Sequence, residues 1–243
     1  MGRFFAFAYG IAAYLFFSIT FAYAAFFVAG VAVPKTIDSG IATPPLIAAV
    51  IDLGLMALFA VQHSVMARQS FKRWWTKFVP PPIERSTYVL ASSIVLALLL
   101  WQWRPIPEPV WAMQNTSWSA AIWILAAAGW IIVALSTFLI SHFELFGLSQ
   151  VLRHLMRAEP EPAQFRTPLF YRFVRHPLYL GFTIAFWAAP VMSAGHLLFA
   201  VVTTAYIFVG ASLEERDLVS AFGEAYRRYQ AKVPMIFPWK KPL

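Results

Sequence analysis

Residues 4–33 read FFAFAYGIAAYLFFSITFAYAAFFVAGVAV, and this stretch decides the fold class because it contains no charged side chain. As an α-helix it would be roughly 45 Å long, which exceeds the hydrocarbon core of a bilayer, about 30 Å thick. It is also much longer than the apolar region of a signal peptide, which has about 7–15 residues. We therefore expect a membrane helix at this position.

The composition of the whole chain agrees with a membrane protein. Its 243 residues are 60% hydrophobic and 12% charged, with a mean hydropathy of +0.65. The sequence predicts an all-α, polytopic helical bundle with five or six membrane helices, formed as a single membrane-embedded domain over residues 1–243. The other apolar stretches are 45–66, 87–103, 118–141, 178–194 and 196–213.

The last two apolar stretches form an expected C-terminal helical hairpin. Pro190 and Gly195 interrupt them, and each arm is close to the minimum length for a full crossing. Two arrangements stay open: a hairpin that crosses completely, or one that is only partly inserted. After the hairpin, residues 214–230 have apolar side chains at helical spacing, which predicts an amphipathic helix at the cytoplasmic surface.

Basic residues give the orientation. If all six stretches cross, Lys35 and Arg104 are the only two of the 19 Lys and Arg residues on the far side. The positive-inside rule then places both termini in the cytoplasm, with the protein in a bacterial inner membrane. We expect contact with membrane lipid and no nucleic-acid partner, although the net charge is +8. Four tryptophans lie at the predicted outer interface: Trp101, Trp103, Trp111 and Trp118.

The chain has no cysteine, which excludes disulfides, zinc–thiolate sites, iron–sulfur clusters and a cysteine nucleophile. It has five histidines, and no His-x-His or His-x-x-x-His pair occurs. We therefore predict no metal site.

The charged stretch RFVRHPLYLG, residues 172–181, stands directly before an apolar run. Proline fixes its own φ and lacks an N–H, so Pro177 predicts the first residue of a helix. Arg172, Arg175 and His176 would then crowd the positive end of the helix dipole, an arrangement that suits a bound anion. The alternative is that these residues are ordinary cytoplasmic flanking charge.

Acidic residues follow the hairpin: Glu214 and Glu215 begin the run EERD. A hairpin returns its ends to one side, so this acidic run should lie near Arg175 and His176. A zwitterionic ligand would find partners for each of its charges there. The alternative is that these groups pair with one another.

At this point a resemblance appears. The segments RHPLYLG (175–181), EERDL (214–218) and AFGEAYRRYQAKVPMIFPW (221–239) resemble the C-terminal signature of S-adenosylmethionine-dependent membrane methyltransferases, such as isoprenylcysteine carboxyl methyltransferase and phospholipid N-methyltransferases. The segments AVQHSVMARQS (60–70) and SHFELFGLSQV (141–151) are similar to the methanethiol S-methyltransferase family. This second resemblance extends over nearly the whole chain.

The resemblance implies a small apolar thiol as substrate, S-adenosylmethionine as methyl donor and S-adenosylhomocysteine as product. It places the cofactor site in about residues 142–243. The implied cofactor-binding residues are Arg175, His176, Tyr179, Glu214, Glu215, Tyr226 and Tyr229. The prenylcysteine enzymes have an arginine shortly before their acidic run, whereas YIFVGASLEE (206–215) has none, which argues against a large lipid substrate.

Transfer of a methyl group to a thiol needs a thiolate, and even a cysteine thiol has a pKa of about 8.5. A proton acceptor is therefore expected near the sulfur. The predicted catalytic residues are His63, His142 and Glu144, which lie in or beside apolar segments. Asp52 and His63 share one helix face but are separated by about 16 Å of rise.

Two other functions remain open at this stage. One keeps the cofactor and changes the acceptor to a lipid or a prenylcysteine. The other is a non-enzymatic membrane protein associated with haem or a metal, because the amino-terminal half also resembles a membrane family associated with nitric oxide reductase. The sequence leaves the oligomeric state open.

Overall fold

The computed structural model describes residues 2–159 and 165–239. These residues form two compact units. Within the described residues, the first unit takes in residues up to 107 together with 141–159, and the second takes in 108–140 and 165–239. The prediction of a single functional domain over the chain stays a prediction.

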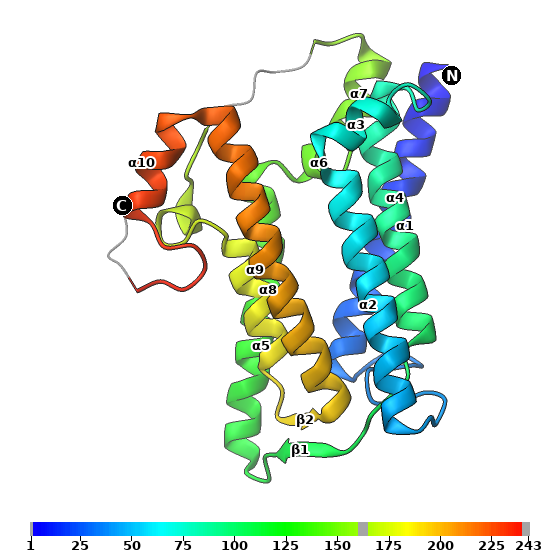
Figure 1. Cartoon of the computed structure of the whole chain (residues 1–243), viewed down its shortest axis with the longest axis vertical. Coiled ribbons are helices and arrows are strands. Elements are labelled where there is room, and N and C mark those ends of the chain that lie inside the picture. Colours follow the sequence, from blue (N-terminus) through cyan, green and yellow to red (C-terminus); the bar gives the residue numbers. More distant parts are fainter. Residues whose placement is uncertain (1, 160–164, 240–243) are drawn as a thin grey trace. The chain divides into compact units, whose positions relative to one another are not determined.

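Helices dominate both units (Figure 1), and the described residues contain five helices long and apolar enough to cross a membrane. This confirms the all-α, polytopic fold class. α1 stops at Ala29, four residues before the apolar run ends, because Gly30 takes a left-handed conformation with φ of 72° and caps the helix. The five helices are α1 (Arg3–Ala29), α2 (Pro45–Ala67), α4 (Pro81–Gln102), α5 (Thr116–Ile140) and α9 (Ala194–Phe222).

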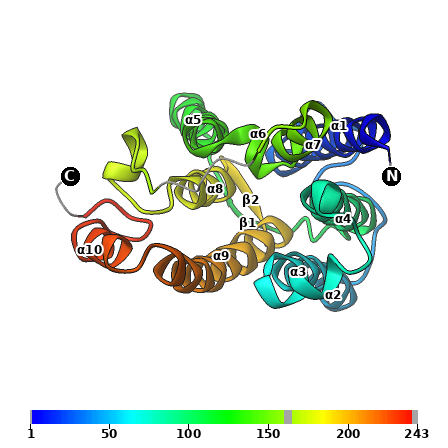
Figure 2. The ribbon, with the colours of Figure 1, turned by 90° about the horizontal axis from the view of Figure 1, so that it is seen from above.

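The first unit contains α1, α2 and α4 with three short helices, namely α3 (Gln69–Trp75), α6 (His142–Leu145) and α7 (Leu148–Met156). α4 packs against both α1 and α2, and α7 packs against α1, as the view from above also shows (Figure 2). Gly10 permits the contact between α1 and α7, because a Cβ there would lie 2.6 Å from Cγ2 of the fully buried Val151. The segment that follows α5 thus forms two short helices, α6 and α7.

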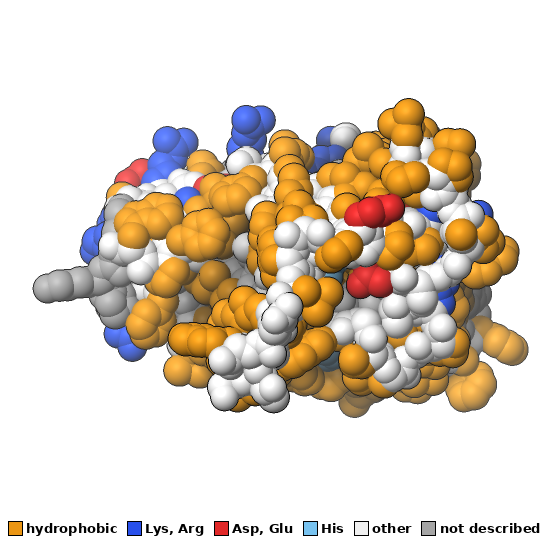
Figure 3. Space-filling view, turned by 90° about the horizontal axis from the view of Figure 1, so that it is seen from below, with side chains coloured by type: hydrophobic (Ala, Val, Ile, Leu, Met, Phe, Trp, Pro, Cys, Tyr) orange, Lys and Arg blue, Asp and Glu red, His pale blue; other side chains and the backbone are white. Residues whose placement is uncertain are grey.

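One end of the first unit is closed by buried polar contacts. The buried Asp52 accepts a hydrogen bond from the backbone N–H of Arg104 at 2.9 Å, and the indole of Trp103 donates to the Ile37 carbonyl at 3.0 Å. In the view from below, hydrophobic side chains alternate with other side chains and backbone, and Asp or Glu side chains are visible among them (Figure 3).

The second unit contains α5 and α9 with α8 (Pro177–Trp187), α10 (Glu224–Lys232), the 3-10 helix η1 (Leu169–Arg172), and the strands β1 (Pro109–Ala112) and β2 (Val191–Ser193). α5 and α8 touch through their backbones at two glycines. A Cβ on Gly129 would lie 2.7 Å from the amide nitrogen of Ala185, and one on Gly181 would lie 2.7 Å from the Gly129 carbonyl oxygen. Neither position has room for a side chain.

The hairpin differs from the prediction in its first arm. α8 ends at Trp187 instead of continuing to 194, because Pro190 cannot continue a helix. The chain then runs on to β2, which pairs antiparallel with β1 and brings Ser193 opposite Pro109. Since β1 precedes α5, the turn of the hairpin at β2 lies near the start of α5. The first arm, α8, packs along α5. Pairing with β1 satisfies part of the backbone of residues 191–193.

The second arm also differs from the prediction. Residues 214–222 continue α9 instead of opening a surface helix, and the break comes at Gly223, which has φ of 55°. Only α10 is separate. It is amphipathic, because Tyr226 and Tyr229 are buried whereas Arg227 and Arg228 are exposed.

Candidate functional site

The site in the second unit is built on the two residues that precede α8. Pro177 is the first residue of that helix, as predicted, and the buried His176 is its N-cap. The backbone N–H of Arg175 donates to the Pro234 carbonyl at 2.9 Å, and that of His176 donates to the Met235 carbonyl at 3.0 Å. The C-terminal segment therefore fixes this dipeptide in place, and these two N–H groups are not free to bind an anion.

Four hydrogen bonds to protein groups hold the Arg175 side chain. Its Nε and Nη2 donate to the two carboxylate oxygens of Glu215 at 2.6 and 3.1 Å. Its Nη1 donates to the carbonyls of Gln230 and Val233 at 2.9 and 2.7 Å. Both side chains of the ion pair are only 11% exposed. The guanidinium thus joins α8, α9 and α10 and is not oriented to hold a ligand carboxylate.

Glu215 has further partners beyond Arg175. His176 Nε2 lies 3.1 Å from its Oε1, and Gln230 Nε2 donates to its Oε2 at 2.9 Å. Both oxygens of this buried carboxylate are therefore occupied. Gln230 was not identified from the sequence. Its position four residues after Tyr226, on the same helix face, could have indicated that it lies near the site.

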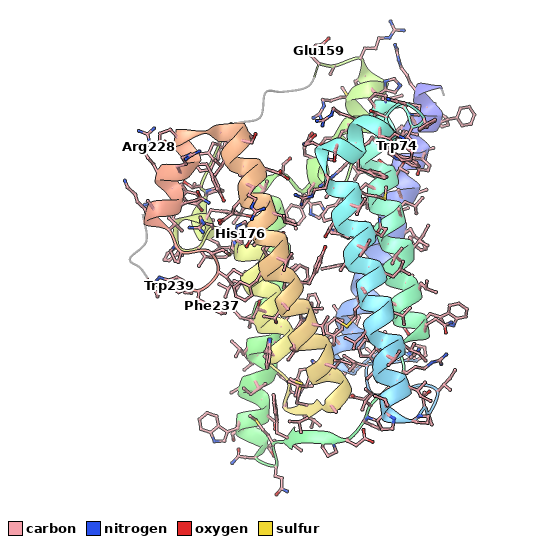
Figure 4. The ribbon with its side chains drawn as sticks, in the orientation of Figure 1. Trp74, Glu159, His176, Arg228, Phe237 and Trp239 are labelled. Carbon is pink, nitrogen blue, oxygen red and sulfur yellow. The ribbon has the colours of Figure 1, made fainter. Side chains whose placement is uncertain are left out.

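Glu214 is the open member of the acidic pair, because its side chain is 47% exposed. The Tyr179 hydroxyl donates to its Oε2 at 2.8 Å, and His176 Nδ1 lies 3.7 Å from the same oxygen. The rings of His176 and Tyr179 stack with centroids 5.2 Å apart. A partly exposed carboxylate therefore lies beside two stacked rings, at the place marked by His176 in Figure 4.

Tyr226 and Tyr229 lie in an aromatic core beside this cluster. Both rings pack against Phe165, and Tyr229 donates its hydroxyl proton to the Tyr171 carbonyl at 2.5 Å. Burial raises the pKa of both phenols, so they remain protonated at neutral pH. These contacts support α10 against α9. A hollow of about 330 Å³ lies next to the core and is lined by Ser212, Glu215, Arg216, Val219 and Gln230.

His63 lies in the first unit, within the membrane helix α2. Its Nδ1 is 3.2 Å from the hydroxyl of Ser92, and its Nε2 is 2.9 Å from the hydroxyl of Tyr88. The imidazole also stacks on Phe59 at 5.3 Å. The neighbouring Gln62 donates to the same Ser92 hydroxyl at 3.3 Å. His63 is thus part of a polar cluster between α2 and α4.

His142 and Glu144 also lie in the first unit, on α6. His142 Nε2 is 2.7 Å from the Tyr14 hydroxyl, and burial lowers the pKa of this imidazole. The Glu144 carboxylate accepts two hydrogen bonds from Arg153, at 2.7 and 2.8 Å. Gln150 donates to the Glu144 backbone carbonyl and to its Oε1. Glu144 is therefore already neutralised by an arginine, whereas His142 has only neutral partners among these contacts.

Two other ionisable residues have structural partners. His196 is buried in the first turn of α9, with its Nε2 2.9 Å from the Phe186 carbonyl near the end of α8. Asp52 binds the chain at Arg104, as described above. In the part of the chain that the structure describes, no group of three or more His, Cys, Asp or Glu residues is arranged to hold a metal ion.

Comparison with known proteins identifies relatives over almost the whole chain. Residues 53–233 match the family described as NnrU protein. The chain is 60% identical to methanethiol S-methyltransferase 1 of Bradyrhizobium diazoefficiens over 98% of its own length and 84% of that protein. It is 52% identical to methanethiol S-methyltransferase of Mycobacterium tuberculosis over 98% of both chains.

A more distant relative is nurim of Sus scrofa, which is 30% identical over 69% of this chain and 66% of that protein. No solved structure matches the chain. The long alignments at high identity decide the family. The chain belongs to the methanethiol S-methyltransferase family and to the NnrU protein family.

Proposed function

We propose that the protein is an S-adenosylmethionine-dependent methyltransferase that methylates a small thiol, methanethiol first, to give dimethyl sulfide. The names of its relatives support the acceptor. The observation that carries the cofactor assignment is the half-exposed Glu214 carboxylate beside the stacked rings of His176 and Tyr179.

The residues of this site suit the two positive charges of the cofactor, its ammonium and its sulfonium. A half-exposed carboxylate such as Glu214 would bind an ammonium group by a charge-assisted hydrogen bond. The stacked rings of His176 and Tyr179 would lie next to a sulfonium, which aromatic faces attract as they attract other cations. Arg175 and Glu215, together with Tyr226 and Tyr229, would hold these groups in position.

Bound S-adenosylmethionine supplies a methyl group on a sulfonium, which is transferred to the sulfur of a thiolate. Positive and negative charge combine in this reaction, so water that stabilises the separate charges slows it. The protein's contribution is to exclude water and to orient the two sulfur atoms in line. An apolar, membrane-embedded protein provides such surroundings and also attracts an apolar thiol.

The proton of the thiol needs an acceptor. Among His63, His142 and Glu144, we propose testing His63 first. Glu144 is already paired with Arg153. His63 contacts two hydroxyl groups that can pass a proton onward, those of Tyr88 and Ser92. His142 is the second choice because it contacts one hydroxyl, that of Tyr14.

We also propose that both termini face the cytoplasm of a bacterial inner membrane. If α8 and the residues up to 193 cross together with the five candidate spanning helices, the number of crossings is even, which leaves the two termini on one side. The distribution of Lys and Arg residues then favours the cytoplasm for that side.

Calorimetric titration of the detergent-purified protein with S-adenosylhomocysteine tests the cofactor, and product analysis with methanethiol and S-adenosylmethionine tests the acceptor. Binding together with dimethyl sulfide supports both proposals. Binding without dimethyl sulfide would reject the thiol and direct the search to lipid acceptors. Absence of binding would reject the cofactor site.

A further inference from the structure

The C-terminal strap, residues 233–236, is part of the framework of the site. Val233 and Ile236 are each only 1% exposed. The carbonyls of Pro234 and Met235 accept the backbone N–H groups of Arg175 and His176, and the Val233 carbonyl accepts a hydrogen bond from the Arg175 side chain. Any displacement of the strap would therefore move His176.

The aromatic tail, residues 237–239, follows the strap directly and is exposed. Phe237 is 43% exposed and Trp239 is 68% exposed. The N–H of Trp239 donates to the Phe237 carbonyl at 3.0 Å, so the tail forms a tight turn. Figure 4 shows His176 beside α9 and the two aromatic residues at the edge of the same unit. The tail thus links an outer surface to the strap.

The neighbours of the tail indicate what covers it. The ring of Phe237 lies 6.5 Å from that of Phe208, which belongs to the membrane-spanning helix α9. Phe208 and the adjacent Val209 are 40% and 58% exposed, as expected for side chains that face lipid. Phe237 therefore lies beside an exposed apolar face of a helix long enough to span a membrane.

The charges on α10 agree with this location. Arg227, Arg228 and Lys232 are all exposed and lie just before the strap. Exposed tryptophan next to basic side chains is typical of the boundary between acyl chains and head groups, where indole rings and Lys or Arg side chains each reach their preferred surroundings.

We infer that the aromatic tail is a membrane-interface anchor whose partner is bilayer lipid, and that the strap transmits this anchoring to the Arg175–His176 dipeptide. Phe237 and Trp239 are then positioning residues for the site. The lipid contact stands on its own, whereas the effect on ligand affinity rests on the proposed function.

Fluorescence quenching tests the lipid contact without any ligand. The wild-type protein and Trp239→Phe are reconstituted in phosphatidylcholine vesicles with and without lipid brominated high on its acyl chains. We expect the fluorescence contributed by Trp239, obtained as the difference between the two proteins, to be strongly quenched by the brominated lipid. If this difference is the same in both kinds of vesicle, the anchor is refuted.

Ligand affinity tests the transmission. S-adenosylhomocysteine is titrated into phosphatidylcholine–phosphatidylglycerol nanodiscs that hold the wild type or the double variant Phe237→Ser/Trp239→Ser. We expect at least about a fivefold loss of affinity in the double variant, the lower end of typical coupling between sites. Trp239→Phe should restore most of the affinity that Trp239→Ser loses.

Trp74→Ser is the matched control, because Trp74 is also exposed (49%) but belongs to α3 of the first unit, away from the strap in sequence. Its affinity should stay within about twofold of wild type. Equal affinity of the double variant and the wild type would overturn the transmission. A wild type that does not bind S-adenosylhomocysteine would instead refute the proposed function, and the quenching result would still decide whether the tail is an anchor.

Discussion

At the scale of single residues, Glu214 and Glu215 are adjacent acids with different surroundings. Glu215 is buried and bound by Arg175, His176 and Gln230, whereas Glu214 is half exposed and bound by Tyr179. The sequence predicted that both acids would lie beside the basic pair, because a hairpin brings its ends together. It could not separate their roles, because the difference arises from Gln230 and from the strap.

This difference predicts that two matched substitutions affect different properties, ligand binding in one case and stability in the other. Glu214→Gln should weaken S-adenosylhomocysteine binding by about 10-fold or more, the value of one charge-assisted hydrogen bond, with little change in the thermal unfolding midpoint. Glu215→Gln should lower that midpoint, because it leaves the buried Arg175 without its counter-charge. Calorimetry and thermal unfolding measure the two effects. Equal loss of stability in both variants would contradict the division of roles.

A second residue-scale prediction concerns His63. His63→Ala should lower the turnover of methanethiol by about 100-fold, the lower range for removal of a general base, and leave the affinity for S-adenosylhomocysteine nearly unchanged. His142→Ala is the comparison, with an expected smaller loss. Steady-state production of dimethyl sulfide provides the measurement. Unchanged turnover in His63→Ala would remove this residue as the proton acceptor.

Tryptophans show what sequence reasoning misses at this scale. All four at the predicted outer interface were expected to contact the boundary of the bilayer. Trp101 and Trp118 are 71% and 68% exposed, as such a role requires, but Trp103 is fully buried and donates to Ile37. The position of a tryptophan relative to an apolar stretch predicts its depth in the membrane. The direction in which its side chain points depends on the packing between helices.

At the scale of elements, local rules set some boundaries and tertiary contacts set others. Pro177 marked the start of α8 correctly, because proline constrains the backbone by itself. The end of α8 at Trp187 and the strands β1 and β2 were not predicted. Both strands are very short, and their pairing joins residues about 80 positions apart, which no local pattern reveals.

The contact of α5 with α8 gives a prediction at this scale. Gly181→Ala should destabilise the protein by about 1–3 kcal/mol, because the new methyl group would approach the Gly129 carbonyl and force the two helices apart. Gly210→Ala is the matched control, since a Cβ on this α9 residue meets nothing within 4 Å. Thermal unfolding in one detergent compares the two variants, and equal midpoints would contradict close helix contact at Gly181.

At the scale of the whole molecule, the absence of cysteine allows a direct test of orientation. Single substitutions Ile41→Cys and Arg228→Cys place thiols at exposed positions before α2 and on α10. In intact spheroplasts, a membrane-impermeant maleimide should label the first and spare the second. Permeabilised cells should show labelling of both. Labelling of Arg228→Cys alone in intact spheroplasts would reverse the proposed orientation.

α9 runs without a proline from Ala194, beside β2, to Glu214 and Glu215 and on to Phe222. Such a helix is stiff along its axis, so it acts as a rod that connects the β-strand end of the second unit with the acidic pair. The backbone hydrogen bonds of this one helix connect the two regions along the chain, about 30 Å apart at 1.5 Å per residue. On the proposed function, a substitution in β2 is therefore expected to reach the cofactor site through α9, although the two lie at different heights along the helix.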